Sequence, residues 1–355
     1  GWVATIGLDQ HAWRWMLGIE VLPAALWFLM LLIVPESPRW LVMKNRMAEA
    51  RQVLESLKPP ERVGPDLEEI VESLATAKDN LLDRLRDVFR SNMRLPLLIG
   101  LIIAVAQQAT GINAIYFYAP TIFEQSGVGT NAAFAQATLI GVINVVFTII
   151  AMLLIDRIGR RPLLLIGLVG VIFSTALTGY GFSQATFELT PDAAAEVSAA
   201  IDREALDPLI GVAFESDLEF KRALRNALGE QAIREHGSEL TQAAIDMNPG
   251  VVLAGILLFV AAFAISLGPV YWCLLSEIFP TRVRGAALAV VGLFNAGTSF
   301  LVQFAFPWEL SNLGNAPTFF VYSAFGLAAL ILMGWLLPET RGKSLEELET
   351  VLASR

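Results

Sequence analysis

Residues 107–118 read QQATGINAIYFY, a run of uncharged hydrogen-bonding side chains inside an apolar stretch from Leu95 to Phe123. Three amides and two phenols at membrane depth suit a neutral, hydroxyl-rich ligand, because an amide both donates to and accepts from a hydroxyl group without carrying a charge. The alternative is that these side chains only hold helices together in an ordinary membrane bundle. This stretch by itself leaves both interpretations open.

The amides in this stretch do not converge on a regular helix. At 100° per residue, Asn113 lies far round the helix axis from Gln107. Gly111 stands between them, and glycine permits the backbone conformations that interrupt a helix. We therefore expect a break at Gly111 that turns Asn113 and the two glutamines toward one cavity, as in the discontinuous helices of transporters.

The composition is that of a polytopic helical membrane protein. Of the 355 residues, 55% are hydrophobic and 17% are charged, and the mean hydropathy is +0.58. A helix needs about 20 apolar residues to cross roughly 30 Å of hydrocarbon. The sequence therefore predicts an all-α protein with seven membrane spans. They are Trp13–Val34, Leu95–Phe123, Ala133–Ile155, Pro162–Phe182, Val251–Ile278, Gly285–Phe306 and Thr318–Leu337.

Other functional classes are not favoured by this sequence. The net charge of -9 does not suggest nucleic acid as a partner. The single cysteine, Cys273, lies in a predicted span, which excludes a disulfide framework and a thiolate metal cluster. His11 and His236 lie outside the predicted spans. With no nucleophile and base pair or phosphate-binding loop in view, we expect no enzyme activity, no cofactor and no metal.

The short loops carry cations on one side of the predicted membrane. Residues 119–132 and 307–317 contain no Lys or Arg, whereas the other loops do. By the positive-inside rule the loops with cations are cytoplasmic, so we expect the chain to start outside and to end with a cytoplasmic C-terminus. The cations in question are Arg157, Arg160, Arg161, Arg282, Arg284, Arg341 and Lys343.

Two segments outside the spans have their own character. Residues 39–94 carry mixed charges with apolar residues at helical spacing, which predicts a cytoplasmic helical linker; a solvated helical hairpin without a specific role is the alternative. Residues 183–248 are acidic and rich in alanine. Thr190 before a proline and Ser216 three residues before Glu219 are typical helix caps, so we expect short soluble helices there.

Glu20 lies inside the first predicted span. It is about two turns, roughly 10 Å, below a predicted aromatic belt at Trp13 and Trp15. A carboxylate at such a depth usually faces a partner or a wet cavity rather than lipid. The alternative is a side chain near enough to the interface to reach water.

Six motifs, taken in order, carry a resemblance to a known family. They are PESPRWL at 35–41, QQATGIN at 107–113, DRIGRRP at 156–162, GPVYW at 268–272, SEIFPTRVRG at 276–285 and PETRGKS at 338–344. Together they resemble the sugar porter family of the major facilitator superfamily, apart from the 183–248 insertion. That resemblance implies a partial fold, with seven of an expected twelve transmembrane helices, in which the first five spans of the N-terminal lobe are missing.

The resemblance also implies a division into parts. Residues 1–38 would hold the last span of the N-terminal lobe, 39–94 the linker, 95–337 the C-terminal lobe with its extracytoplasmic insertion at 183–248, and 338–355 a cytoplasmic tail.

By the same resemblance, three sets of residues receive roles. Those that match sugar-contacting positions are Gln107, Gln108, Asn113, Asn144, Trp272 and Asn295, and those that match an outer gate are Phe117 and Tyr118. A cytoplasmic charge network is implied for Glu36, Arg39, Asp156, Arg160, Arg161, Glu277, Arg284, Glu339 and Arg341. One departure is Ala296, where the family often has tryptophan; this enlarges the cavity and weakens any inference about which sugar fits.

The function expected from these observations is secondary transport of a monosaccharide or polyol by alternating access. Glu20 matches a position that is acidic in proton-coupled members, which favours proton symport over a facilitative uniporter. A sugar-sensing receptor of the same fold is the other alternative; sensors tend to carry a long cytoplasmic tail, and only 345–355 follow the last motif here. The expected location is the plasma membrane, or the cell inner membrane of a bacterium, with the lipid bilayer, the sugar and possible protons as partners.

Overall fold

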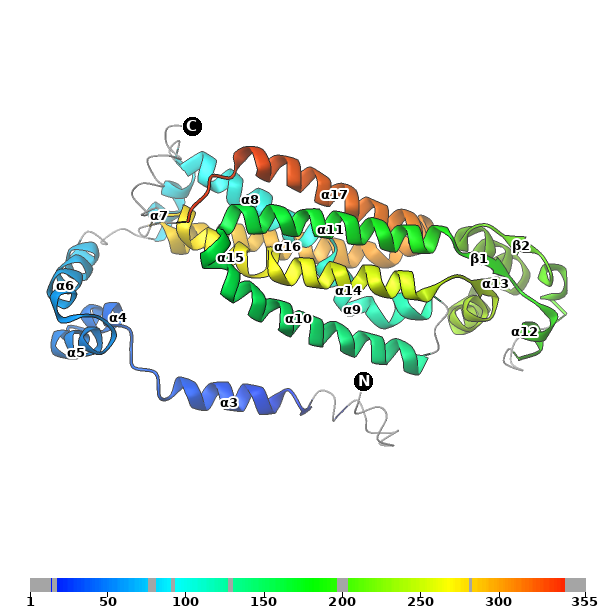
Figure 1. The fold of residues 1–355 in the computed structure, drawn as a ribbon, viewed down its shortest axis with the longest axis horizontal. Helices are drawn as coiled ribbons and strands as arrows, with labels where there is room; N and C mark the ends of the chain where they lie inside the picture. Colours follow the sequence, from blue (N-terminus) through cyan, green and yellow to red (C-terminus); the bar gives the residue numbers. More distant parts are fainter. Residues whose placement is uncertain are drawn as a thin grey trace. The chain divides into compact units, whose positions relative to one another are not determined.

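The computed structural model describes residue 14 and residues 18–75, 81–90, 93–126, 130–196, 204–280 and 283–341. The chain divides into two compact units, residues 1–87 and residues 88–355, and each is described by itself (Figure 1). The predicted aromatic belt at Trp13 and Trp15, His11, and residues 342–355 lie outside the described residues.

The first unit contains one apolar helix and a small helical cluster. The helices are α3 (Val21–Leu31), α4 (Pro38–Met43), α5 (Met47–Leu57), α6 (Pro60–Ala75) and α7 (Leu81–Val88), the last of which ends at the boundary with the second unit. Ser37 caps α4 by accepting a hydrogen bond from the Trp40 amide at 3.2 Å. The predicted amphipathic linker helices pack through Leu41, Val42 and Ala50, with Val53, Leu67 and Ile70 against them.

One ion pair fixes the turn between two of these linker helices. The Lys58 ammonium contacts the Asp66 carboxylate, and this hydrogen bond lowers the pKa of Asp66 below its ordinary value. Arg62 lies 3.4 Å from the other Asp66 oxygen. Helices α4, α5 and α6 therefore form a small packed cluster.

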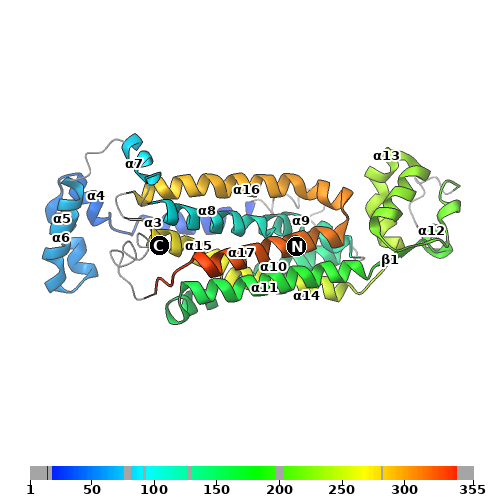
Figure 2. The ribbon, with the colours of Figure 1, turned by 90° about the horizontal axis from the view of Figure 1, so that it is seen from above.

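The second unit is a bundle of long apolar helices. They are α8 (Arg94–Ala109), α9 (Ile112–Glu124), α10 (Thr130–Ile158), α11 (Arg160–Ser183), α14 (Pro249–Ile265), α15 (Leu267–Ile278), α16 (Arg284–Asn312) and α17 (Asn315–Leu336). Figures 1 and 2 show them running side by side along the bundle. Helix α11 packs between α14 and α17, and α8 packs against α16 and α17, so the α8–α9 span lies deepest in the bundle.

The prediction of a partial fold with seven of twelve spans is wrong. Within the part of the chain that the structure describes, six helices are long and apolar enough to cross a membrane. Where the first span was expected, α3 has 11 residues, which extend about 16 Å and are too short for a hydrocarbon layer of roughly 30 Å. The other six predicted spans correspond to observed helices, with ends that shift by a few residues.

Two of the six spans are interrupted by a residue with a non-helical backbone conformation. The first break is at Gly111, whose φ of 89° is left-handed and favours glycine, and it confirms the expected interruption between α8 and α9. The second is at Ser266, between α14 and α15. Pro269 lies in the first turn of α15, where its missing amide hydrogen costs nothing.

The 183–248 insertion is a folded subdomain at the end of the bundle where α11 ends and α14 begins (Figures 1 and 2). It contains β1 (Thr186–Glu188), α12 (Pro191–Glu196), the 3₁₀-helix η2 (Asp207–Leu209), β2 (Ala213–Phe214), α13 (Asp217–Ala244) and β3 (Ile245–Asp246). The expected caps are present, since Thr190 accepts from the Ala193 amide and Ser216 from the Glu219 amide.

The insertion also contains a small sheet that was not expected from the sequence. In this sheet β1 pairs antiparallel with both β2 and β3. Its strands are too short to show a clear alternation in the sequence. The core of the subdomain is Ala185, Phe187, Leu189, Ala194, Leu206, Phe220, Leu224, Leu240 and Ala244.

The insertion is attached to the bundle through a helix cap. A carboxylate oxygen of Asp217 accepts a hydrogen bond from the backbone amide of Asn315, the first residue of α17, at 3.2 Å. A negative charge at a helix N-terminus is stabilising, because the free amides there carry partial positive charge. Lys221 pairs with the same carboxylate at 3.2 Å.

Candidate functional site

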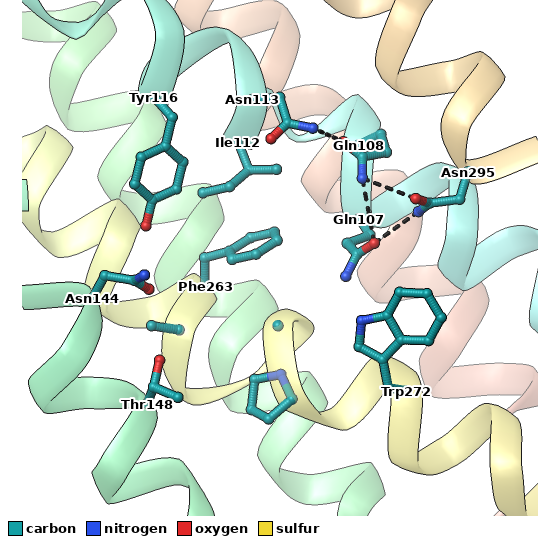
Figure 3. Close-up of a pocket in the computed structure, with 13 residues that line it drawn as sticks. Gln107, Gln108, Ile112, Asn113, Tyr116, Asn144, Thr148, Phe263, Trp272 and Asn295 are labelled. Atoms are coloured by element: carbon teal, nitrogen blue, oxygen red, sulfur yellow. Dashed lines mark hydrogen bonds between the residues drawn. The ribbon is translucent and has the colours of Figure 1, made fainter. Parts of the chain in front are cut away.

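A cavity of about 500 Å³ opens inside the second unit, beside the breaks in the two interrupted spans (Figure 3). All six residues that the sequence matched to sugar-contacting positions line it. Its complete lining is Gln107, Gln108, Ile112, Asn113, Tyr116, Asn144, Thr148, Phe263, Ala264, Gly268, Pro269, Trp272 and Asn295. We call this set the amide pocket.

A chain of amide hydrogen bonds crosses one side of the amide pocket. Asn295 on α16 donates to Gln107 Oε1 at 2.7 Å, and Gln108 donates to Asn295 Oδ1 at 3.1 Å (Figure 3). Gln107 in turn donates to the Leu267 carbonyl at 3.1 Å, at the start of α15. This network therefore joins α8, α16 and the second broken span.

The break at Gly111 brings Asn113 into the same network. Asn113 donates to Gln108 Oε1 and to Ser299 Oγ, both at 2.8 Å. These amides belong to two helix segments that meet at the break, so their convergence depends on the left-handed backbone at Gly111. Ser299, which the sequence did not single out, lies one turn after Asn295 on α16, and that spacing is the signal that identifies it.

The opposite side of the amide pocket carries hydroxyl groups. Tyr116 comes from α9, and Asn144 and Thr148 come from consecutive turns of α10; Figure 3 shows the Tyr116 hydroxyl directed toward Asn144. Tyr116 and Thr148 were not among the predicted site residues. Tyr116 is three residues after Asn113 and Thr148 is four after Asn144, so helical periodicity identifies both.

The chemistry of the amide pocket is neutral. Among the described residues that line it there is no carboxylate, amine, guanidinium or imidazole. Amides and hydroxyls both donate and accept, and Trp272 and Phe263 add flat apolar surfaces. Such a lining can exchange its internal hydrogen bonds for those of a neutral, hydroxyl-rich ligand without burying a charge.

The two predicted gate residues lie outside the amide pocket. Phe117 is 69% exposed, while Tyr118 is half-buried and contacts Phe306 with ring centroids 5.1 Å apart. Consecutive helical residues point 100° apart, so a sequence cannot tell which member of such an aromatic run turns inward. Here it is Tyr116 that faces the cavity.

The predicted charge network forms in part at the other end of α11 from the insertion. Arg160 pairs with Asp156 at 3.0 Å and with Glu277 at 2.9 Å. Glu339 accepts a hydrogen bond from the Arg160 backbone amide at 3.2 Å, at the first residue of α11. Thr340, which the sequence did not single out, donates to Glu277 at 2.6 Å. We call Asp156, Arg160, Glu277, Glu339 and Thr340 the charged cluster.

The other members of the predicted charge network make different contacts. Arg161 donates to the Gly334 carbonyl at 2.8 Å, Arg284 donates to the Phe279 carbonyl at 3.1 Å, and the Arg341 amide donates to Glu339 at 2.9 Å. Glu36 and Arg39 lie in the first unit, as does Glu20, which is exposed in that unit.

Broken membrane helices that meet at a polar pocket are an arrangement found in secondary transporters. Comparison with known families agrees with this class. The family described as "Sugar (and other) transporter" matches residues 3–199 and 236–352, and the chain belongs to this family. The residues between the two matched ranges, 200–235, lie in the insertion.

Three similar proteins show how far the likeness extends. The arabinose-proton symporter of Bacillus subtilis is 31% identical over 95% of this chain and 59% of its own length. The major myo-inositol transporter IolT of the same organism is 34% identical over 97% of this chain and 61% of its own. A structure of the proton:xylose symporter XylE, bound to 6-bromo-6-deoxy-D-glucose, superposes with a TM-score of 0.68 and 29% identity.

That superposition covers 99% of this chain and 62% of XylE. The chain thus spans about three fifths of the length of the relatives it matches. It has a major facilitator superfamily fold and is a multi-pass membrane protein.

Proposed function

We propose that this protein is a secondary transporter that moves a monosaccharide or polyol across the membrane by alternating access, and not an enzyme. The observation that carries the proposal is the amide pocket, which lies at two broken spans and offers neutral donors and acceptors on opposite walls. Its volume of about 500 Å³ is within the usual range for small-molecule sites. The names of the relatives, which refer to arabinose, myo-inositol and xylose, support the same substrate class.

In this proposal the substrate replaces internal partners of the amides. Gln107, Gln108, Asn113, Asn144 and Asn295 would bind its hydroxyl groups, and Trp272 would contact its apolar face. Gln107, Gln108, Asn113 and Asn295 already have hydrogen-bond partners in the pocket, so binding at these four amides exchanges existing hydrogen bonds for new ones. Phe117 and Tyr118 would act at the outer gate.

The charged cluster would hold the cytoplasmic ends of the helices together while the pocket is open to the outside. The remaining members of the predicted network, Glu36, Arg39, Arg161, Arg284 and Arg341, would contribute to the same state. This assignment supports a cytoplasmic C-terminus and an extracytoplasmic insertion, because the loops rich in Arg and Lys belong on the cytoplasmic side. The division into 39–94 as linker, 95–337 as transmembrane lobe and 338–355 as tail belongs to the same proposal.

Proton-coupled symport is the favoured mode of transport. Two of the three relatives are named as proton symporters, and Glu20 matches a position that is acidic in proton-coupled members of the family. A facilitative uniporter would bind the same sugars without using the proton gradient. The comparison of uptake with and without that gradient separates the two modes.

The experiment is uptake of labelled arabinose, xylose, glucose and myo-inositol by vesicles that contain the intact protein. We expect saturable uptake of at least one compound, competed by the unlabelled compound and increased by an inward proton gradient. An uptake rate that is the same with and without the proton gradient would indicate a uniporter. Specific binding of a sugar without any uptake would indicate a sensor, and the absence of both binding and uptake would contradict the proposal.

A further inference from the structure

The break at Gly111 is in contact with a tyrosine from another helix. Tyr322 on α17 is 1% exposed, and a methyl group added to Gly111 would lie 2.8 Å from its ring carbon Cδ2 and 2.9 Å from Cε2. Real Cβ atoms essentially never lie this close to a neighbouring heavy atom. Gly111 is therefore required twice, once by its φ of 89° and once by the ring that lies against it.

The ring of Tyr322 is fixed at its far end by a carboxyl group. Its hydroxyl donates to Glu309 Oε2 at 2.9 Å, and Glu309 is in the last turn of α16. The Glu309 carbonyl also accepts from the amides of Leu313 and Gly314, which close α16. Glu309 thus ties the Tyr322 ring to the corner where α16 leads into α17.

The same ring reaches the segment beyond the break through one more aromatic residue. Phe306 stacks on Tyr322, with ring centroids 6.2 Å apart, and it also contacts Tyr118, with ring centroids 5.1 Å apart. Helix α9 is thus held at two points, at Gly111 where it begins and at Tyr118 two turns later.

We propose that Tyr322, held by Glu309, is a positioning residue for the amide pocket: its ring fixes the break at Gly111 that directs Gln108 and Asn113 into one cavity. Gln108 lies three residues before Gly111 and Asn113 two residues after it, and the two side chains bond at 2.8 Å across the break. A change in the backbone at Gly111 therefore alters the relative direction of these amides. The part of the inference that concerns sugar affinity rests on the proposed function.

The hydroxyl of Tyr322 is the link that an experiment can remove selectively. Tyr322→Phe keeps the ring against Gly111 and Phe306 but removes its hydrogen bond to Glu309. Glu309→Leu removes the acceptor and leaves the tyrosine in place, whereas Glu309→Gln retains an acceptor oxygen at the same position. Tyr180→Phe is a matched control, because Tyr180 is 54% exposed on α11 and does not line the pocket.

The first readout is hydrogen exchange of the intact protein in nanodiscs, which needs no ligand. We expect faster exchange of the amides of residues 109–115 in Tyr322→Phe and Glu309→Leu, and unchanged exchange in Glu309→Gln and Tyr180→Phe. The peptides of α10 and α11 should not change. Unaltered exchange at the break in both disruptive variants, or equal acceleration throughout the bundle, would overturn the proposal.

The second readout is the affinity for the transported sugar. Tyr322→Phe and Glu309→Leu should each weaken binding about tenfold, and the double variant no further, because both remove one link. Glu309→Gln should bind as the unmodified protein does. If the unmodified protein binds sugar and the disruptive variants bind it equally well, this inference alone is overturned. If the unmodified protein binds no sugar, the proposed function is overturned, and hydrogen exchange still tests the positioning role.

Discussion

The amide pocket and the charged cluster both join helices that are far apart in the sequence, but they do so with opposite chemistry. In the pocket, neutral side chains such as Gln108 and Asn295 bond to one another and can each donate or accept. In the cluster, Arg160 faces Asp156 and Glu277; the guanidinium group can only donate hydrogen bonds and the carboxylates can only accept them. The comparison indicates that the pocket is built for exchange of partners and the cluster for attachment of helix ends.

The energies expected from the two regions differ for the same reason. A buried polar group that loses its partner costs about 1 to 3 kcal/mol, because it cannot recover a hydrogen bond from water. An ion pair that water reaches is worth about 0 to 1 kcal/mol. Asp156 is 78% exposed, so its pair with Arg160 belongs to this weak class, and the cluster acts through several contacts together.

The largest effect is expected in the pocket. Gln108→Ala or Asn113→Ala should weaken sugar binding by about 1 to 3 kcal/mol, because substrate hydroxyls and neighbouring amides lose partners. Equilibrium binding of labelled sugar to the purified protein measures this. Asn312→Ala is the matched control, since that side chain is exposed and donates to the Trp308 carbonyl of its own helix. Unchanged affinity in both pocket variants would show that the site is misassigned.

A smaller effect on binding, with a clear effect on transport, is expected in the charged cluster. Glu277→Gln weakens the contacts to Arg160 and Thr340 and should shift the protein toward inward-open states. Distances between spin labels on the cytoplasmic face measure that shift, and uptake should fall. Glu188→Gln, in the insertion, is the control. A distance distribution identical to that of the unmodified protein would count against the proposed role of the cluster.

The effect expected at Glu20 is restricted to energy coupling. If this acid takes part in a proton site, Glu20→Gln should reduce uphill accumulation of sugar by several-fold more than it reduces equilibrium exchange, because an amide cannot contribute a proton affinity that differs between states. Both assays are run on the same vesicles at equal expression. Full accumulation by the variant would leave a facilitative uniporter as the better account.

The smallest effect concerns the attachment of the insertion. Asp217→Asn keeps an oxygen for the Asn315 amide but removes the charge at the N-terminus of α17 and the pair with Lys221. We expect a loss of about 0.5 to 1 kcal/mol in stability, seen as a lower melting temperature, with sugar affinity unchanged. Asp246→Asn, an exposed acid in β3, is the control. A large loss of sugar affinity in Asp217→Asn would mean that this end of the bundle is coupled to the pocket.

Much of the pocket could be predicted because the sequence places amides where apolar residues belong. Gln107, Gln108 and Asn113 stand out in an apolar span, and glycine at 111 explains how they converge. Tyr116 was overlooked because three aromatic residues follow one another, and the choice among them depends on the angle of α9 after the break. That angle is set by Tyr322 on α17, a contact between residues 211 positions apart.

The first unit and the insertion show the limits of reasoning from hydropathy. The apolar residues near the start of the chain predicted a seventh span, yet α3 has 11 residues in the described structure. In the insertion, caps at Thr190 and Ser216 were recognised because they are local, whereas the pairing of β1 with β3 joins residues about 58 positions apart and leaves no local signal.

The central claim is that a sugar binds in the amide pocket, and the most direct measurement is a structure of the intact protein with the transported sugar bound at saturation. The account predicts sugar hydroxyls within hydrogen-bond distance of Gln108, Asn113 and Asn295, with Trp272 against the ring and the break at Gly111 preserved. Density for the sugar elsewhere, with the amides still bonded to one another in an empty pocket, would contradict it.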